Sequence, residues 1–141
     1  MVHEYRTSRR IEFADTDMAG IAHFSRFYVF MEQAEHEFLR SLGFSIHMEL
    51  DGELISWPRV QASCEFTAAV RFEDEVKIRL FVKRKGSKSM TYGCEFSKDG
   101  EAVAVGELTS VCCLCDPGGG VMKGIEIPAV IADKIEQAPP E

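Results

Sequence analysis

The chain has 141 residues, with 16 Lys plus Arg against 23 Asp plus Glu, so its formal net charge at pH 7 is −7. A chain of this length forms one domain, and a hydrophobic content of 45% supplies a core, which excludes disorder as its main state. The acidic balance argues against a general nucleic-acid binder, because such proteins need a basic surface to displace counterions from phosphates.

The apolar runs of the chain, its first residues and its five cysteines predict the cellular compartment of the protein. No stretch approaches the roughly 18 uninterrupted apolar residues of a membrane span, and the first residues lack the apolar run of a signal peptide. The cysteines lie in apolar, alternating segments, where Cys behaves as a small hydrophobe, so we expect reduced thiols and no metal site. We therefore predict a cytoplasmic protein with no membrane partner, a single domain over residues 1–136 and a flexible tail over residues 137–141.

The first elements predicted along the chain are a strand over residues 9–13 and one long helix. Ser25 can cap the start of this helix, and Gly43 provides its stop. Apolar residues recur at a spacing of three and four, which places them on one stripe that faces a sheet. The stripe comprises Phe27, Phe30, Met31, Ala34, Phe38 and Leu42, and the opposite side carries Glu32, Glu35, Glu37 and Arg40.

The rest of the chain reads mainly as strands. Residues 60–66, 76–83, 90–96 and 102–115 alternate or run apolar in the manner of strands, with turns predicted at 85–88, 98–101 and 116–120. Pro128 opens a short helix that ends near residue 135. Consecutive hairpins make the sheet mainly antiparallel, so we predict an α+β fold in which one curved sheet of about five to six strands wraps a long helix.

The segment before the long helix holds the densest polar group, with Asp15, Asp17 and Gly20 in a loop. Two acids this close also serve as caps or turn residues, and their spacing does not continue as a calcium loop requires. A functional interpretation is that backbone amides between Gly20 and the helix start polarise a carbonyl, while an acid attacks it or activates a water. A carboxylate beside an oxyanion hole is the arrangement for acyl transfer.

These residues, read as D-x-D-x-x-G before an aromatic-rich helix that holds Met31-Glu32, resemble the hotdog-fold acyl-CoA thioesterases of the 4-hydroxybenzoyl-CoA thioesterase type. The resemblance covers nearly the whole chain. It implies that Asp17 is the catalytic nucleophile or general base, that amides around Gly20 polarise the thioester, and that Asp15 is structural. It implies no cofactor, since coenzyme A is part of the substrate.

The chain departs from this family beside the motif. One branch of the family has an aromatic residue at the position of His23 and a His at the position of Phe24, so the two residue types are exchanged in this chain. Arg26 stands where the family usually has Asn. His23 is a candidate second acid or base, or a histidine packed at the mouth of the loop. Glu32 either fixes the loop or is a solvated helix charge.

A basic stretch gives candidates for binding coenzyme A. Between Lys77 and Lys88 the chain holds six of its sixteen basic residues and no acid. A non-functional interpretation of this basic stretch is a solvated strand face whose charges prevent aggregation. The resemblance places nucleotide contacts at this hairpin, and the predicted phosphate-binding residues are Arg84, Lys85, Lys88 and Ser89.

The resemblance also implies a homodimer or homotetramer with a site between protomers. Asp17 and the helix start come from one subunit, and residues 57–60 come from the other. Three aromatic residues either line an acyl pocket or belong to an ordinary core: Phe24, Phe27 and Trp57. The sequence therefore favours neither an aromatic nor a short aliphatic acyl group as the substrate. The alternatives to a thioesterase are an acyl-CoA hydratase or dehydratase on the same fold, which pairs a His with an acid, and a non-catalytic acyl-CoA-binding module.

Overall fold

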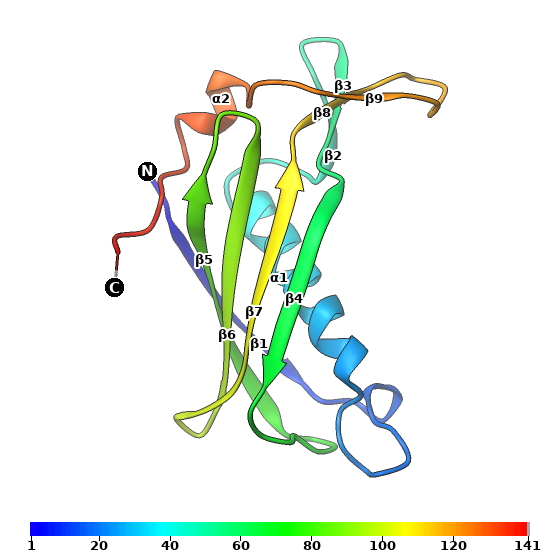
Figure 1. The fold of residues 1–141 in the computed structure, drawn as a ribbon, viewed down its shortest axis with the longest axis vertical. Helices are drawn as coiled ribbons and strands as arrows, with labels where there is room; N and C mark the ends of the chain where they lie inside the picture. The colour runs from blue at the N-terminus through cyan, green and yellow to red at the C-terminus, as the bar shows by residue number, and fades with distance from the viewer. Residues whose placement is uncertain (141) are drawn as a thin grey trace.

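The computed structural model describes residues 1–140, and Figure 1 shows how its elements follow one another from β1 to α2. The strands are β1 (Glu4–Arg10), β2 (His47–Leu50), β3 (Glu53–Ser56), β4 (Arg59–Phe66), β5 (Glu75–Lys85), β6 (Ser89–Lys98), β7 (Glu101–Val111), β8 (Cys113–Cys115) and β9 (Met122–Gly124). The helices are the 3₁₀ helix η1 (Phe13–Asp15), the long helix α1 (Phe24–Ser41) and the short helix α2 (Ala129–Ala132).

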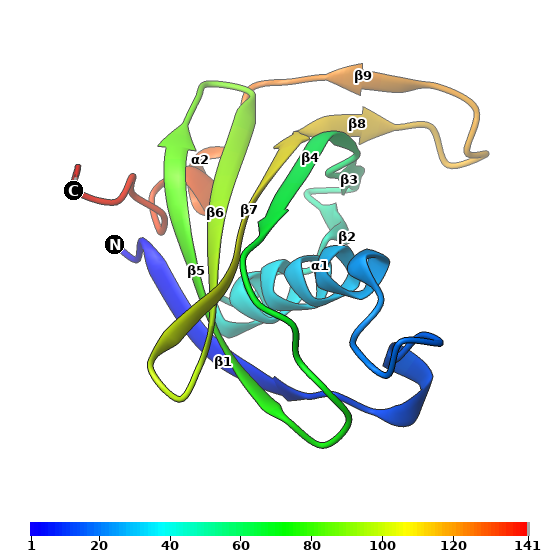
Figure 2. The same ribbon diagram turned by 60° about the horizontal axis from the view of Figure 1, so that its bottom comes forward.

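The main sheet has five strands in the order β1-β5-β6-β7-β4, and every neighbouring pair is antiparallel. Figure 2 shows this sheet curving around α1. The predicted α+β architecture, with one antiparallel sheet wrapped around a long helix, is confirmed. Strand β4 ends the sheet on one side, so its outer edge carries backbone groups that no strand among residues 1–140 pairs with.

Helix α1 packs its apolar stripe against the inner face of the sheet. The approach is close at β7, because a Cβ atom on Gly106 would collide with Sδ of Met31 and the carbonyl oxygen of Ser63. The prediction is wrong for one residue of the polar side. Glu35 is only 1% exposed, because Arg59 on β4 donates a hydrogen bond to its carboxylate. Within residues 1–140, no helix is long and apolar enough to cross a membrane.

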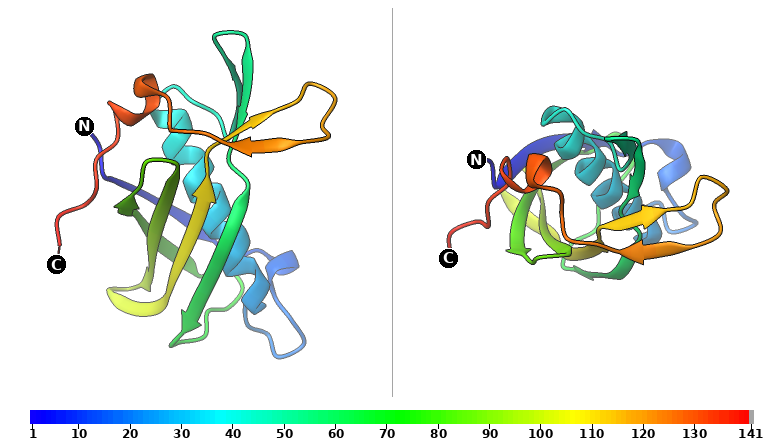
Figure 3. Two further views of the ribbon diagram at one scale, coloured as in Figure 1. Left: turned by 45° about the horizontal axis from the view of Figure 1, so that its top comes forward. Right: turned by 90° about the horizontal axis from the view of Figure 1, so that it is seen from above.

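A second sheet, β2-β3-β8-β9, extends beyond the main sheet and was not predicted (Figure 3). The prediction of one long strand over residues 102–115 is wrong in one respect, because the structure divides this segment at Cys112 into β7 and β8. After this division the chain leaves the β4 ladder and pairs with β3 instead. The second sheet therefore prolongs the ladder of β4 and β7 at one end of the molecule.

The hairpins agree with the predictions, and three segment ends do not. Strand β1 ends at Arg10 and is followed by η1, whereas a strand was expected over residues 9–13. Helix α1 begins after His23 rather than Ser25, because the His23 side chain accepts a hydrogen bond from the Ser25 amide. The predicted tail is attached at its start, since the amide of Ala138 donates to the carbonyl of Val82 on β5. Its last residue, 141, lies outside the described residues.

Candidate active site

The loop that carries both predicted acids lies between η1 and α1, and Asp15 holds it in shape. Asp15 is buried, and its carboxylate accepts hydrogen bonds from the amide of Glu12 (2.8 Å) and from Nε of Arg26 (2.6 Å). The carbonyl oxygen of Asp15 accepts from the amide of His23 at 2.8 Å. These contacts are consistent with a structural role for Asp15, and they give Arg26, which departs from the family pattern, a definite partner.

Asp17 has the opposite environment, because it is exposed and lines a groove. Its Oδ1 accepts a hydrogen bond from the amide of Ala19 at 2.8 Å, and its own amide donates to the carbonyl of Ile21 at 2.9 Å. Its second carboxylate oxygen, Oδ2, has no hydrogen-bond partner within residues 1–140. The loop therefore fixes the backbone of Asp17 and leaves one oxygen for another molecule.

The amides near Gly20 are arranged differently from the sequence-based expectation. Gly20 takes a positive φ of 79° and its amide donates to the carbonyl of Asp17 at 3.0 Å, so this amide is already used inside the loop. In the described chain, the amides of Ile21 and Phe24 have no acceptor. Phe24 is the first residue of α1, where the helix dipole is positive. Of these amides, that of Gly20 is therefore used within the loop, whereas those of Ile21 and Phe24 have no acceptor among residues 1–140.

His23 acts as the N-terminal cap of α1. Its Nδ1 accepts from the amide of Ser25 (3.3 Å) and lies 2.8 Å from Oγ of Ser25, and its ring lies against that of Phe24. The residue is exposed and does not line the groove beside Asp17. The geometry gives His23 a capping function, and its predicted role as an acid or base has no contact with the groove to support it.

The groove beside Asp17 has a volume of about 450 Å³ and is mainly apolar. Its lining residues are Asp17, Ile21, Ala22, Phe24, Phe27, Phe66, Thr67, Ala68, Ala69 and Val70. Phe24 and Phe27, two of the residues predicted for a pocket or a core, line this groove, and both rings contact Phe66 edge to face. Phe66, at the end of β4, was not among the candidates, although strand alternation from residue 60 gave it an apolar place. Trp57 is only 6% exposed, packs in the core and does not line this groove.

The four predicted phosphate-binding residues lie at the far end of the sheet from Asp17 in the same chain (Figure 1). Lys85 is not free, because its Nζ donates to the carbonyls of Ala132 (2.7 Å) and Ile135 (2.8 Å). Lys88 and Arg84 are exposed and Ser89 is half-buried. Arg84 lines a shallow cavity of about 520 Å³ with Lys83 and Gln137.

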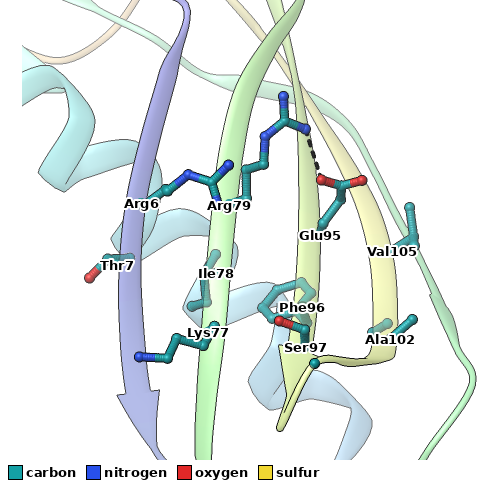
Figure 4. Close-up of a pocket in the computed structure, with 12 residues that line it drawn as sticks. Arg6, Thr7, Lys77, Ile78, Arg79, Glu95, Phe96, Ser97, Ala102 and Val105 are labelled. Atoms are coloured by element: carbon teal, nitrogen blue, oxygen red, sulfur yellow. Dashed lines mark hydrogen bonds and ion pairs between the residues drawn. The ribbon is translucent and has the colours of Figure 1, made fainter. Parts of the chain in front are cut away.

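The outer face of β5 is less basic than the sequence suggested, because acids from other strands neutralise it. Arg79 binds Glu4 (2.5 Å) and Glu95 (2.8 Å), and Lys83 binds Glu107. A groove of about 330 Å³ lies on this face. Figure 4 shows its lining residues, with Arg79 pointing toward Glu95 in front of the strands and α1 behind them. Since its charges pair within the chain, this groove is a weaker ligand site than the one at Asp17.

Cys64 and Cys94 do not offer a competing nucleophile. All five are free thiols, and burial raises the pKa of Cys94 to about 12 and that of Cys64 to about 11. A thiol with such a pKa stays protonated near neutral pH and is a poor nucleophile. In the part of the chain that the structure describes, no three His, Cys, Asp or Glu side chains are grouped to hold a metal ion.

A buried polar cluster was missed by the sequence analysis. Glu35 on α1, Arg59 on β4 and Ser110 on β7 hydrogen-bond to one another. A signal for it exists, because Glu35 stands four residues after Met31 and three before Phe38, on the apolar stripe. Glu32, predicted as a loop anchor or a solvated charge, is more than half exposed and lies 3.6 Å from Arg59, so it does not contact the loop.

The chain is similar to known proteins in sequence and in fold. The sequence pattern of the thioesterase superfamily matches residues 19–105. A candidate esterase of Aquifex aeolicus (strain VF5) is 29% identical over 125 residues, which cover 89% of this chain and 95% of that protein. A 1,4-dihydroxy-2-naphthoyl-CoA hydrolase of Synechococcus sp. (strain CC9605) is 28% identical over 109 residues, or 74% of this chain and 73% of that protein.

A solved structure is also similar over nearly the whole chain. The gentisyl-coenzyme A thioesterase BH1999 superposes with a TM-score of 0.76 at 29% identity, covering 91% of this chain and 99% of that one. At this coverage and TM-score the two chains share their fold.

Proposed function

Since the chain belongs to the thioesterase superfamily, we propose that it hydrolyses an acyl-CoA thioester, with Asp17 as the reacting carboxylate. The observation that carries the proposal is the position of Asp17: an exposed carboxylate with one unpaired oxygen lines an apolar groove, which is also lined by Phe24, the first residue of α1, whose amide has no acceptor. In the overall reaction water adds to the thioester carbon, the C–S bond breaks, and the products are a free acid and the thiol of coenzyme A.

Two roles for Asp17 fit this position. As a nucleophile, the carboxylate attacks the carbonyl carbon, the coenzyme leaves as thiolate, and water then hydrolyses the resulting anhydride. As a general base, it removes a proton from the water that attacks the same carbon. In both cases negative charge develops on the carbonyl oxygen, and each amide aimed at that oxygen is worth roughly 3–4 kcal/mol. We propose the amides of Ile21 and Phe24 as donors in place of that of Gly20.

The acyl group that we propose is aromatic. The groove is bordered by the rings of Phe24, Phe27 and Phe66, and aromatic rings pack favourably edge to face against one another. Two of the similar proteins are named for dihydroxynaphthoyl and gentisyl thioesters. We place aromatic acyl-CoA ahead of short aliphatic acyl-CoA, which the sequence had left equal.

We also propose that the active unit is a homodimer, with a tetramer as an alternative. The free edge of β4 exposes Val60 (62%) and Phe66 (44%), and a long free apolar edge of this kind invites pairing. Two-fold antiparallel pairing of β4 puts the partner's residues 57–60 beside Phe66 at the groove. It also turns the partner's Arg84, Lys88 and Ser89 toward the end of the molecule that holds Asp17. A cytoplasmic location stays a prediction.

The test is thiol release from a panel of aromatic, short-chain and long-chain acyl-CoA thioesters. We expect Asp17→Asn to lower kcat at least 100-fold and to leave binding of a non-hydrolysable thioether nearly unchanged, because Asn can still accept from the amide of Ala19. Glu12→Gln, an exposed acid of the same loop region, serves as the control and should retain activity. Undiminished hydrolysis by Asp17→Asn would refute the assignment, and binding without any hydrolysis by the unmodified protein would favour a binding module.

A further inference from the structure

Arg71 is a cation beside the active-site loop that neither the sequence analysis nor the proposed mechanism uses. It lies in the segment between β4 and β5, directly after Val70 of the groove lining. Its backbone forms a β-bridge with Ile21, next to Gly20. The loop of Asp17 and the segment of Arg71 are therefore joined through their backbones.

A small hydrogen-bonded turn fixes the base of the Arg71 side chain. The amide of Arg71 donates to Oδ2 of Asp74 at 2.8 Å, and the amide of Asp74 donates back to the carbonyl of Arg71 at 3.0 Å. Lys98 approaches the same carboxylate at 2.9 Å, so Asp74 is already paired with a cation. The Arg71 backbone is thus held in place, while Asp74 is occupied by other groups.

The guanidinium of Arg71 extends over the active-site loop. Its Nη1 lies 3.7 Å from the point that a Cβ atom on Gly20 would occupy. Because Gly20 has no side chain, nothing of that residue screens the guanidinium from a molecule that approaches the loop. The charge therefore lies near Gly20, which is three residues along the chain from Asp17, and close to Ile21 and Val70 of the groove lining.

Arg71 differs from most arginines of this protein in lacking an acidic partner. Six of the nine arginines form an ion pair with a carboxylate: Arg6, Arg9, Arg10, Arg26, Arg59 and Arg79. The side chain of Arg71 makes no hydrogen bond and no ion pair with any of residues 1–140, and it is exposed. Of the three arginines without such a pair, Arg71 is the one that contacts the active-site loop.

We infer that Arg71 binds an anionic oxygen of the substrate at the mouth of the groove. A guanidinium presents a planar pair of donors that matches a carboxylate or a phosphate, and such charge-assisted bonds are stronger than neutral ones. The anionic oxygen belongs either to an acidic substituent of the acyl group or to a phosphate of coenzyme A. The inference rests on the proposed function, because it takes the groove beside Asp17 as the substrate site.

The experiment measures binding, so that it does not depend on turnover. Four thioether probes that cannot be hydrolysed are titrated by calorimetry: a phenacyl and a 4-carboxyphenacyl group, each on coenzyme A and on pantetheine. We expect Arg71→Gln to raise Kd about tenfold or more wherever the recognised anion is present. A loss confined to the two carboxylated probes assigns the acyl group, and a loss confined to the two coenzyme A probes assigns a phosphate.

Two further variants keep the outcome clear. Arg71→Lys keeps the charge and loses the planar fork, so we expect a Kd between those of the unmodified protein and Arg71→Gln. Arg10→Gln removes an exposed arginine that does not line the groove and should leave every Kd unchanged. An equal loss for all four probes, or no loss for any, overturns the role of Arg71. The role of Asp17 is judged separately by hydrolysis with Asp17→Asn, so either idea can fail alone.

Discussion

Arg59 on β4 donates two hydrogen bonds of 2.9 Å to the carboxylate of Glu35 on α1, one from each terminal nitrogen of its guanidinium. The Glu35 side chain is 1% exposed, so this ion pair joins the helix to the edge strand inside the protein. Oγ of Ser110 lies between them, accepting from Arg59 at 2.6 Å and donating to Glu35 at 3.1 Å. A buried ion pair contributes little net stability, but loss of one partner leaves an uncompensated charge.

We therefore predict that Glu35→Ala lowers the free energy of unfolding by about 3–5 kcal/mol, because Arg59 is left without its buried partner. Urea denaturation followed by circular dichroism measures the change. The matched control is Glu32→Ala on the same helix, which removes an exposed acid 3.6 Å from Arg59 and should cost less than about 1 kcal/mol. Similar losses for the two variants would contradict the importance of the buried pair.

A second prediction concerns the free edge of β4. Val60→Glu places a charge on the edge that we propose pairs with a second copy, where it would lie against the apolar groove near the partner's Phe66. We expect the mass measured by light scattering to fall from twice the chain mass to one chain mass, with loss of thiol release. Val130→Glu, an exposed valine on α2, should change neither. A monomeric but fully active Val60→Glu protein would disprove the shared site.

A third prediction follows from Asp74, which anchors the Arg71 segment. Hydrogen bonds from the Arg71 amide and from Lys98 lower the pKa of Asp74 below its ordinary value of 3.8. Because the folded state lowers this pKa, the stabilisation is present above pH 3.8 and is lost as the pH falls through the folded value. Asp74→Asn should therefore flatten the pH dependence of the unfolding free energy below about pH 4. Denaturation curves at several pH values test this, and an unchanged slope would count against it.

The sequence predicted the elements that carry a strong period. The helix stripe, the alternation of β5 and β6 and the turns between them depend on local residues, and the structure confirms them. The strands of the second sheet are short, and their pairing depends on contacts far apart in the chain. No local period marks β2, β3 or β9, and β8 was predicted only as the end of the strand that contains β7.

The site shows the same division between local and distant information. The position of the Asp17 loop before α1 follows from its motif, and Phe24 and Phe27 reach the groove from one helix face. By contrast, the burial of Glu35 depends on Arg59, which is 24 residues away along the chain. The hydrogen bonds of the Lys85 ammonium depend on carbonyls that are about 50 residues away along the chain. Spacing within one element cannot give partners of that kind.

The contacts of the two chain ends bear on how this protein can be joined to other molecules. Val2 forms a parallel bridge with Ile135, and Ala138 bonds to β5, so both termini lie at the β1 and β5 side of the sheet (Figure 1). Strand β4 forms the opposite border. A tag, a dye or a second domain fused to either terminus would therefore leave the β4 border open, and attachment to a surface through a terminus should preserve assembly.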